Sequence, residues 1–355
     1  MVEQLQSYKG KKVLITGDTG FKGSWLAFWL YKLGAEVMGY ALPAENEHDH
    51  FHLIKLNQKI KHIDGNILDF ETLQSAFNTF KPEIVFHLAA QSLVRLSYDK
   101  PQLTFETNVT GSVNVLEAIK NCPSVRSVIY VTSDKCYKNN EWIWGYRETD
   151  TLGGHDPYSA SKAAAELIFS SYCDSFFSKQ DNIGLASVRA GNVIGGGDWA
   201  LDRIIPDCIK AVMNNQPIVI RNPHATRPWQ HVLEPLSGYL MLGIQLYHNP
   251  KLFAGAWNFG PPTDSIKTVD ILTKEVVKIL GKGNIEILPD KHKHEASILH
   301  LNCDKANSIL HWHPTWDFTN TILQTVEWYK GYLKKTDSEL LTEQDINNYV
   351  KMNSK

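Results

Sequence analysis

Apolar and polar positions alternate in a way that predicts strands and helices following one another through the first half of the chain. Short apolar runs typical of buried strands cover 12–16, 36–40, 84–88, 125–132 and 183–189. Helical patterns cover 20–33, 69–80, 101–120 and 157–177. Strands separated by helices pair in parallel through right-handed crossovers, with helices on both faces. The predicted fold class is therefore α/β, a doubly wound parallel sheet.

The alternation ends near residue 190. Beyond it, three consecutive glycines at 195–197 and several prolines indicate loops between shorter elements. We therefore predict a first domain over 1–190 and a smaller, mixed α/β substrate lobe over 191–355. Strand-like runs around Val219 and Asn258 leave open that segments of the second half return to the first domain.

Composition and charge narrow the class of protein. The 355 residues are 43% hydrophobic and 21% charged, which excludes disordered, collagen-like and coiled-coil chains. A net charge of −2 gives no general attraction to nucleic acid or to anionic membranes, so neither is an expected partner. The five cysteines form no C-x-x-C pair, which argues against a disulfide framework and a cysteine zinc site and favours a reducing compartment.

No segment predicts a membrane span or a signal peptide. The most apolar stretch, 24–42, is interrupted by Lys32, Gly34 and Glu36 and is too short to cross a bilayer. The first twelve residues are polar. We expect a cytoplasmic protein.

Alternating histidines lack a third or fourth ligand at a typical spacing, so no metal site is expected.

A glycine loop joins the first strand to the first helix. In it, Gly17 allows a tight turn, Gly20 allows a pyrophosphate to approach the backbone, and Gly23 allows the helix to pack close to the sheet. The helix N-terminus offers free N–H groups to phosphates. This context predicts a Rossmann-type dinucleotide site, with contacts from Gly17, Thr19, Gly20, Phe21, Lys22 and Gly23.

The acidic residue that usually binds the adenosine ribose is missing at the end of the second strand. Residues 39–42 read Gly-Tyr-Ala-Leu, and the first acid afterwards is Glu45. Because no arginine stands there for a 2′-phosphate, the sequence favours NAD over NADP. The remaining contacts expected with this cofactor come from 64–67 and the third apolar run: Asn66, Ile67, Leu88, Ala89 and Ala90.

Tyr158 and Lys162 lie four residues apart at the start of a helix, on one face. A lysine cation beside the phenol is expected to lower the phenol pKa from about 10 toward neutrality, so that the phenolate takes a proton from a sugar hydroxyl. Lys162 is also expected to bind the nicotinamide ribose. The strand over 125–132 ends at Thr132 and Ser133, either of which could hydrogen-bond the same hydroxyl.

Together, the glycine loop, the Ser/Thr pair and the Tyr-x-x-x-Lys spacing resemble the extended short-chain dehydrogenase/reductase superfamily. Within it, 132–137 (Thr-Ser-Asp-Lys-Cys-Tyr), 189–199 and 294–296 (His-Glu-Ala) are similar to CDP-glucose 4,6-dehydratases. The likeness covers roughly residues 8–330. It implies an internal redox cycle in which hydride leaves carbon 4 of the sugar for NAD, water is lost across carbons 5 and 6, and hydride returns to carbon 6.

The resemblance also implies roles for residues after the fifth strand. Asp134 is the candidate acid for the departing 6-hydroxyl, which requires a raised pKa. Related dTDP-glucose enzymes have Asp-Glu here, with Glu as the base, whereas this chain has Asp134-Lys135. A lysine base must first lose its proton, which costs roughly 4–5 kcal/mol at neutral pH for an ordinary lysine. Either Lys135 is the base, or it only positions Asp134 or the sugar.

Further contacts follow from the same likeness. It implies a cofactor contact at Asn108 and substrate contacts at Gln91, Asn192, Arg203, Arg227 and Asn258. The fork of Arg227 suits a nucleotide diphosphate, although a solvated surface charge is the alternative. Dehydratases for dTDP sugars carry arginines where residues 293–296 read Lys-His-Glu-Ala, which favours cytidine.

Three rival functions stay open. A dehydratase for another nucleotide hexose would share these residues. A nucleotide-sugar 4-epimerase would return hydride to carbon 4 and need no acid for carbon 6, so Asp134 argues against it. A non-catalytic NAD sensor has no need of Ser133, Tyr158 and Lys162. The family also implies a homodimer or higher homo-oligomer, with the two long helices over 101–120 and 157–177 as candidates for pairing.

Overall fold

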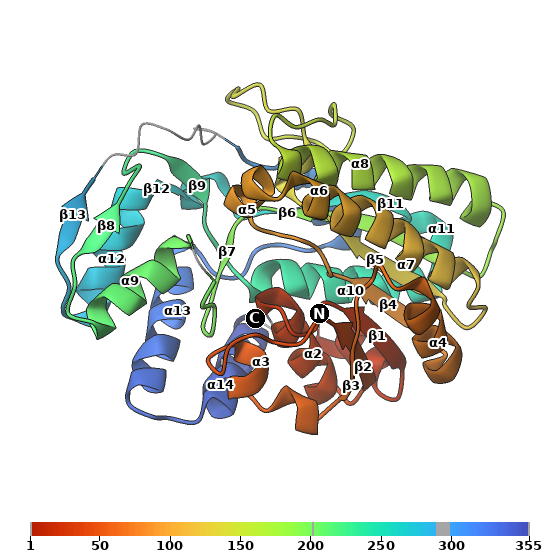
Figure 1. Ribbon diagram of the computed structural model, residues 1–355, viewed down its shortest axis with the longest axis horizontal. Helices are drawn as coiled ribbons and strands as arrows, with labels where there is room; N and C mark the ends of the chain where they lie inside the picture. The colour runs from red at the N-terminus through yellow and green to blue at the C-terminus, as the bar shows by residue number, and fades with distance from the viewer. Residues whose placement is uncertain (1, 201, 289–298, 354–355) are drawn as a thin grey trace.

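The computed structural model describes residues 2–200, 202–288 and 299–353, and it places a large sheet between two layers of helices (Figure 1). Its helices are α1 (Val2–Leu5), α2 (Phe21–Lys32), α3 (His50–Leu53), α4 (Phe70–Phe80), α5 (Val94–Asp99), α6 (Pro101–Phe105), α7 (Gly111–Lys120), α8 (Pro157–Tyr172), α9 (Ile204–Met213), α10 (Leu233–His248), α11 (Pro250–Phe253), α12 (Val269–Leu280), α13 (Phe318–Leu333) and α14 (Ser338–Asn353). Its strands are β1 (Lys12–Thr16), β2 (Glu36–Ala41), β3 (Lys61–Asp64), β4 (Ile84–His87), β5 (Ser127–Val131), β6 (Gly184–Ala190), β7 (Val193–Ile194), β8 (Ile218–Ile220), β9 (Thr226–Pro228), β10 (Gln230–His231), β11 (Gly255–Phe259), β12 (Ile266–Thr268) and β13 (Ile285–Ile287).

The large sheet has seven strands in the order β11-β6-β5-β4-β1-β2-β3, and every neighbouring pair is parallel. The chain reverses direction of winding between β1 and β4, so a crevice opens there at the carboxyl ends of the strands. This arrangement confirms the predicted α/β class and the Rossmann-type parallel sheet.

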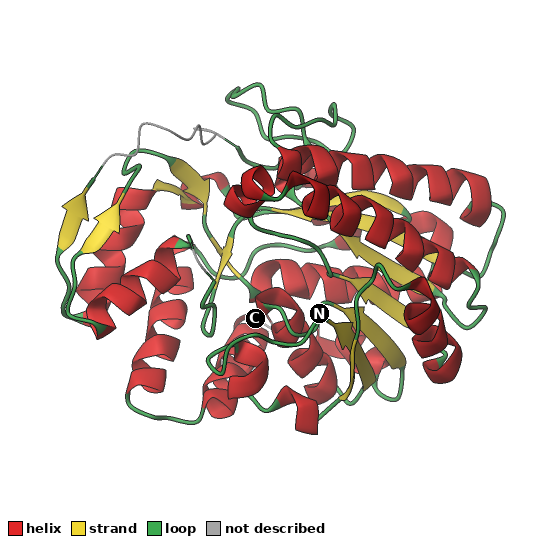
Figure 2. Ribbon diagram, viewed as in Figure 1, coloured by secondary structure: helices red, strands yellow, loops and turns green. Residues whose placement is uncertain are grey.

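Alternate residues of each central strand enter two different cores. In β1, Val13 and Ile15 pack with α2 and α10 on one face, whereas Leu14 packs with α4, α7 and α8 on the other. In β5, Ile129 and Val128 divide in the same way. Figure 2 shows these two helical layers on either side of the sheet. Because both faces are covered, the strands read as continuous apolar runs.

Two segments from beyond residue 190 join this sheet. Strand β11 pairs with β6, with Asn258 opposite Arg189, and α10 packs against β5 and β6. By contrast, Val219 lies in β8, which pairs with β13 outside the large sheet. The small pairs β9–β12 and β8–β13 lie with α9 and α12 at the other end of the molecule (Figure 1). A domain boundary at residue 190 stays a prediction.

The structure differs from the sequence pattern mainly where local signals are weak. The helix over 101–120 is α6 and α7 joined by a π-helical turn, η3 (Glu106–Thr110), and α8 continues into another, η5 (Cys173–Phe177). Strand β3 was missed because its residues are partly exposed and polar. No described helix is long and apolar enough to cross a lipid bilayer.

Candidate active site

A cavity of about 1380 Å³ lies along the carboxyl ends of the central strands. Its walls include the loop after β1, the segments after β3, β4, β5 and β6, the start of α8, and residues of the smaller end such as Arg227. Helix α5, which the sequence pattern did not predict, adds Arg95 and Tyr98. A cleft at this edge, at the point where strand order reverses, is where ligands bind in open α/β sheets.

The glycine loop has the shape that a dinucleotide requires. Gly17 has φ +82°, and a Cβ there would stand 2.7 Å from the Ala89 nitrogen. A Cβ at Gly23 would stand 2.0 Å from the Gly17 oxygen. The residues present therefore fit such a cofactor, since only glycine leaves this cradle open. The predicted cofactor residues that line the cavity are Gly17, Thr19, Gly20, Phe21, Lys22, Gly23, Asn66, Ile67, Leu88, Ala89, Ala90, Tyr158 and Lys162.

A buried carboxyl group that the sequence pattern did not predict lies under this loop. Asp18 is fully buried, and a Cβ on Gly39 of β2 would stand 1.9 Å from its Oδ2. His62 Nδ1 lies 2.7 Å from the same oxygen. Burial raises the pKa of Asp18, and the His62 ring opposes that rise. The glycine in place of the usual ribose-binding acid is thus explained locally, because Asp18 occupies the space that its side chain would need.

The catalytic candidates come together where β5 ends and α8 begins. Asp156 caps α8 in a capping box with Ser159, which fixes the first helical turn. That turn presents Tyr158 to η4 (Asp134–Cys136), where Ser133 donates a hydrogen bond of 2.9 Å to Asp134. The Lys135 Nζ lies 6.0 Å from the centre of the Tyr158 ring. Ser133, Asp134, Lys135, Tyr158 and Lys162 all line the cavity.

Burial dominates the electrostatics of these groups. It raises the pKa of Asp134, against the opposing effects of Lys135, Ser133, Lys22 and Arg227. It lowers the pKa of Lys162 to about 8 and that of Lys22 to about 8. These shifts have the direction expected for a proton-donating carboxyl and for buried ammonium groups.

The expected lowering of the Tyr158 pKa was wrong for the protein on its own. Burial raises the pKa of Tyr158 to about 12, and Ser133 lowers it only in part. Desolvation of the phenolate at this buried position is the largest cause of the rise. Thr132 also differs from Ser133, because its hydroxyl is bound to Glu166.

Three of the predicted substrate residues line the cavity: Asn192, Arg203 and Arg227. Arg203 donates to Asp198 at 2.8 Å. Arg227 is among the cations that lower the pKa of Asp134, so its charge is felt inside the cavity. Residues 293–296, whose sequence favoured cytidine, lie outside the described residues.

Three amide side chains that were expected to contact ligands hold loops together and do not line the cavity, so their binding roles stay predictions. The Gln91 amide donates to the Leu93 carbonyl and accepts from its N–H. Asn108 donates to the Gln91 carbonyl and to Ser161. Asn258 is fully buried, accepts from Tyr137 and donates to the Tyr146 carbonyl. In each of the three side chains, both amide N–H groups donate to partners within the protein.

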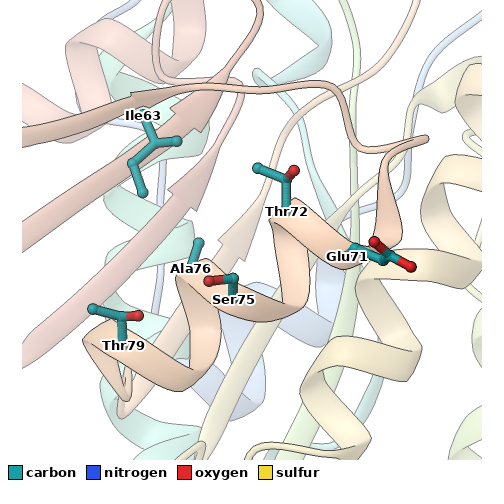
Figure 3. Close-up of a pocket in the computed structure, with 6 residues that line it drawn as sticks. All are labelled: Ile63, Glu71, Thr72, Ser75, Ala76 and Thr79. Atoms are coloured by element: carbon teal, nitrogen blue, oxygen red, sulfur yellow. The ribbon is translucent and has the colours of Figure 1, made fainter.

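A second, shallower hollow of about 400 Å³ lies beside α4 (Figure 3). Side chains on one face of the helix, including Thr72 and Ser75, face Ile63 of β3. Glu71 is its one ionisable lining residue. Because it gathers no set of groups for chemistry, we assign the function to the larger cavity.

The sequence as a whole matches a known family of sugar-modifying enzymes. The family model described as GDP-mannose 4,6 dehydratase matches residues 14–325. The chain belongs to this family. A CDP-glucose 4,6-dehydratase of Salmonella typhimurium is 49% identical over 348 residues, covering 97% of each chain.

Solved structures share the fold. A dTDP-glucose 4,6-dehydratase of Bacillus anthracis in complex with NAD superimposes with a TM-score of 0.77 at 20% identity, covering 93% of this chain and 100% of its own. A UDP-glucose 4-epimerase of Thermus thermophilus in complex with NAD gives 0.77 at 24% identity, covering 90% and 99%. The dehydratase and the epimerase superimpose on this chain with the same TM-score, so the shared fold alone does not separate the two reactions.

Replacing the buried lysine should stabilise the protein without its cofactor. Because the pKa of Lys162 falls from 10.5 to about 8 on folding, its charge opposes folding in full below pH 8 and not at all above about 10.5. Lys162→Met should therefore raise the free energy of unfolding by about 3 kcal/mol at pH 7. The gain should shrink as the pH rises from 8 to 10.5, measured by urea unfolding across that range.

Lys278→Met is the matched control, since that side chain is 73% exposed. It should change stability little at every pH. A Lys162→Met gain that does not depend on pH would contradict a buried cation at this site.

Proposed function

We propose that the protein is a lyase that dehydrates CDP-D-glucose to CDP-4-dehydro-6-deoxy-D-glucose, with NAD as its cofactor. The observation that carries the proposal is a buried carboxyl group, Asp134, in the same cavity as the Tyr158 phenol. The CDP-glucose 4,6-dehydratase of Salmonella typhimurium, which is 49% identical to this chain, supports the proposal. An epimerase would need no acid at the sixth carbon, so the buried Asp134 favours dehydration.

The first step is proton removal from the 4-hydroxyl. Tyr158 takes this proton, and Ser133 lies beside both Tyr158 and Asp134 to orient the hydroxyl. Lys162, as a cation, compensates the phenolate that this step requires. The chemistry that bound NAD supplies is acceptance of a hydride from carbon 4 and its return to carbon 6, so no cofactor is consumed.

The elimination needs an acid and a base on the same side of the cavity. The ketone formed at carbon 4 acidifies the proton on carbon 5. Asp134 gives its proton to the departing 6-hydroxyl, which leaves as water, and burial raises the pKa of this carboxyl in the direction that favours its protonated form. Lys135, beside the Tyr158 ring, removes the carbon 5 proton as a neutral amine. After hydride returns, Lys135 gives that proton back to carbon 5, and the proton that Tyr158 took from the 4-hydroxyl replaces the one that Asp134 gave, so the atoms balance.

The nucleotide end lies toward the smaller end of the molecule. Arg203 and Arg227 line that part of the cavity with Asn192. A guanidinium fork matches the paired oxygens of a diphosphate. We assign these three side chains to the nucleotide diphosphate and the sugar.

The substrate is tested by comparing CDP-, dTDP-, GDP- and UDP-glucose as substrates in the presence of NAD. The highest kcat/KM is expected with CDP-glucose, read from the near-ultraviolet absorbance that 4-keto-6-deoxy sugars show in alkali. Tyr158→Phe is the control and should form no product. Preference for another nucleotide would overturn the assignment to cytidine, and a 4-epimer without alkaline absorbance would overturn dehydration.

Removing the acid should separate the two halves of the reaction. Asp134→Asn should retain oxidation at carbon 4 but slow product formation at least about 100-fold, since the amide has no proton to give. Reduced nicotinamide should then build up on the enzyme, measured by its absorbance after mixing. Asp181→Asn, at an exposed position paired with Lys251, should behave like the natural protein. Normal turnover in Asp134→Asn would refute its role.

The base is tested by Lys135→Met. Loss of the base should stop exchange of the carbon 5 proton with deuterated water, while the cofactor is still reduced. Mass spectrometry of recovered sugar measures that exchange. Lys138→Met, at an exposed neighbour, is the control. A near-normal rate in Lys135→Met would leave only a positioning role for Lys135.

We also propose a homo-oligomer in the cytoplasm. Large apolar side chains stand exposed on one side of the sheet: Leu103, Phe105, Leu167 and Phe176. Such a patch on α6, α8 and η5 suits a second copy of the chain. Leu167→Glu should shift the mass measured by light scattering toward the monomer, whereas an unchanged mass would place the interface elsewhere.

All five cysteines are free thiols, which supports the proposed location in a reducing compartment, the cytoplasm.

A further inference from the structure

A buried ion pair joins α8 to β6, and neither of its side chains lines the cavity. Arg189 on β6 donates to Glu166 twice, with Nη2 at 2.7 Å from Oε2 and Nε at 2.9 Å from Oε1. Both side chains are at most 4% exposed. Glu166 lies one helical turn beyond Lys162, which lies one turn beyond Tyr158, so the three share one face of α8.

Further hydrogen bonds from both side chains hold the ion pair in place. The Glu166 carboxylate also accepts hydrogen bonds from Thr132, at the end of β5, and from Ser187. Arg189 also donates to Tyr137, at 2.7 Å, and to the Glu148 carbonyl. Tyr137 itself lines the cavity. The carboxylate therefore has a fixed position relative to both α8 and the cavity wall.

Glu166 is the anion that faces Lys162. The other titratable groups around that lysine are Cys136 of η4, His87 of β4 and Lys22 of α2. Burial raises the pKa of the Cys136 thiol and lowers that of His87 to about 3, so both are neutral at pH 7. Lys22 is a competing cation. Burial lowers the pKa of Lys162, and Glu166 is the first group that opposes it.

We propose that Glu166, held in place by Arg189, is a positioning residue that keeps Lys162 cationic while Tyr158 removes the substrate proton. This inference rests on the proposed function for its catalytic consequence. Its electrostatic part concerns the protein alone. Neither residue touches the ligand space, so both act through Lys162.

Glu166→Gln tests the electrostatic part directly, because the amide keeps the shape and removes the charge. At the roughly 6 Å that separates helix positions four apart, a unit charge shifts a neighbouring pKa by about one to two units. The midpoint of Lys162 should therefore fall by about one to two pH units. It is measured on the cofactor-free protein by competitive acetylation of Lys162 across pH, read by mass spectrometry.

The catalytic part is tested by single-turnover reduction of the nicotinamide across pH. Its alkaline limit should fall by the same amount in Glu166→Gln. Ser187→Ala is the matched control, because it removes one neutral donor to the same carboxylate and should leave both midpoints unchanged. Glu166→Asp, which keeps the charge, should restore them at least in part.

Arg189 left without its partner could prevent Glu166→Gln from folding. The double variant Glu166→Gln/Arg189→Met removes both charges together, and it should still lower the Lys162 midpoint. An unchanged midpoint in a folded variant would overturn the inference. If the natural protein reduces no cofactor with any nucleotide sugar, the proposed function fails instead, while the acetylation result still decides the role of Glu166.

Discussion

The contact between the end of β5 and the first turn of α8 is the constraint on which the site depends. Strand β5 stops at Val131, and the next residues turn into η4 with Ser133 as its cap. Helix α8 starts against it, fixed by the capping box of Asp156 and Ser159. Because the two elements come from different parts of the chain, the sheet core beneath them sets their distance. That core places the acid and the phenol in one cavity.

The same contact explains why so many charges are buried there. Lys22 approaches from α2, Lys162 from α8 and Asp134 from η4, and each has its pKa shifted by burial. Burying cations costs stability. A cavity of this size with lysine and arginine side chains in its lining is suited to a ligand that carries negative charge, such as a nucleotide diphosphate. The cost in the empty protein is then offset when the ligand binds.

The sequence predicted the parts of the site that depend on local order. The glycine loop, Ser133, Asp134 and the Tyr158–Lys162 spacing each lie within a few residues of a strand or helix end, where pattern fixes position. For Gln91, Asn108 and Asn258, local order does not decide the role. An amide near a cavity can bind a ligand or tie two loops together, and only the partners available in three dimensions decide between the two.

Long-range packing accounts for the remaining differences. Strand β11 joins the sheet beside β6 more than sixty residues after it, and only the finished sheet edge shows where it belongs. The Tyr158 pKa was also misjudged, because the spacing of Tyr158 and Lys162 reports their proximity but not how completely water is excluded. Asp18 under the glycine loop is a similar case, since its partner His62 lies on β3.

Dehydratases and epimerases share this scaffold, so the difference between them must come from few groups. Both need a phenol and a lysine to oxidise carbon 4. Only dehydration needs a second proton donor that reaches carbon 6, and this donor must stay protonated near neutral pH. In this chain burial raises the pKa of Asp134, the direction that this requirement needs, although Lys22, Lys135 and Arg227 all oppose the rise. The packing of Gly191, where a Cβ would stand 3.0 Å from Asp134 Oδ2, keeps that carboxyl enclosed. The exclusion of water around one side chain is therefore the physical basis for choosing dehydration over epimerisation.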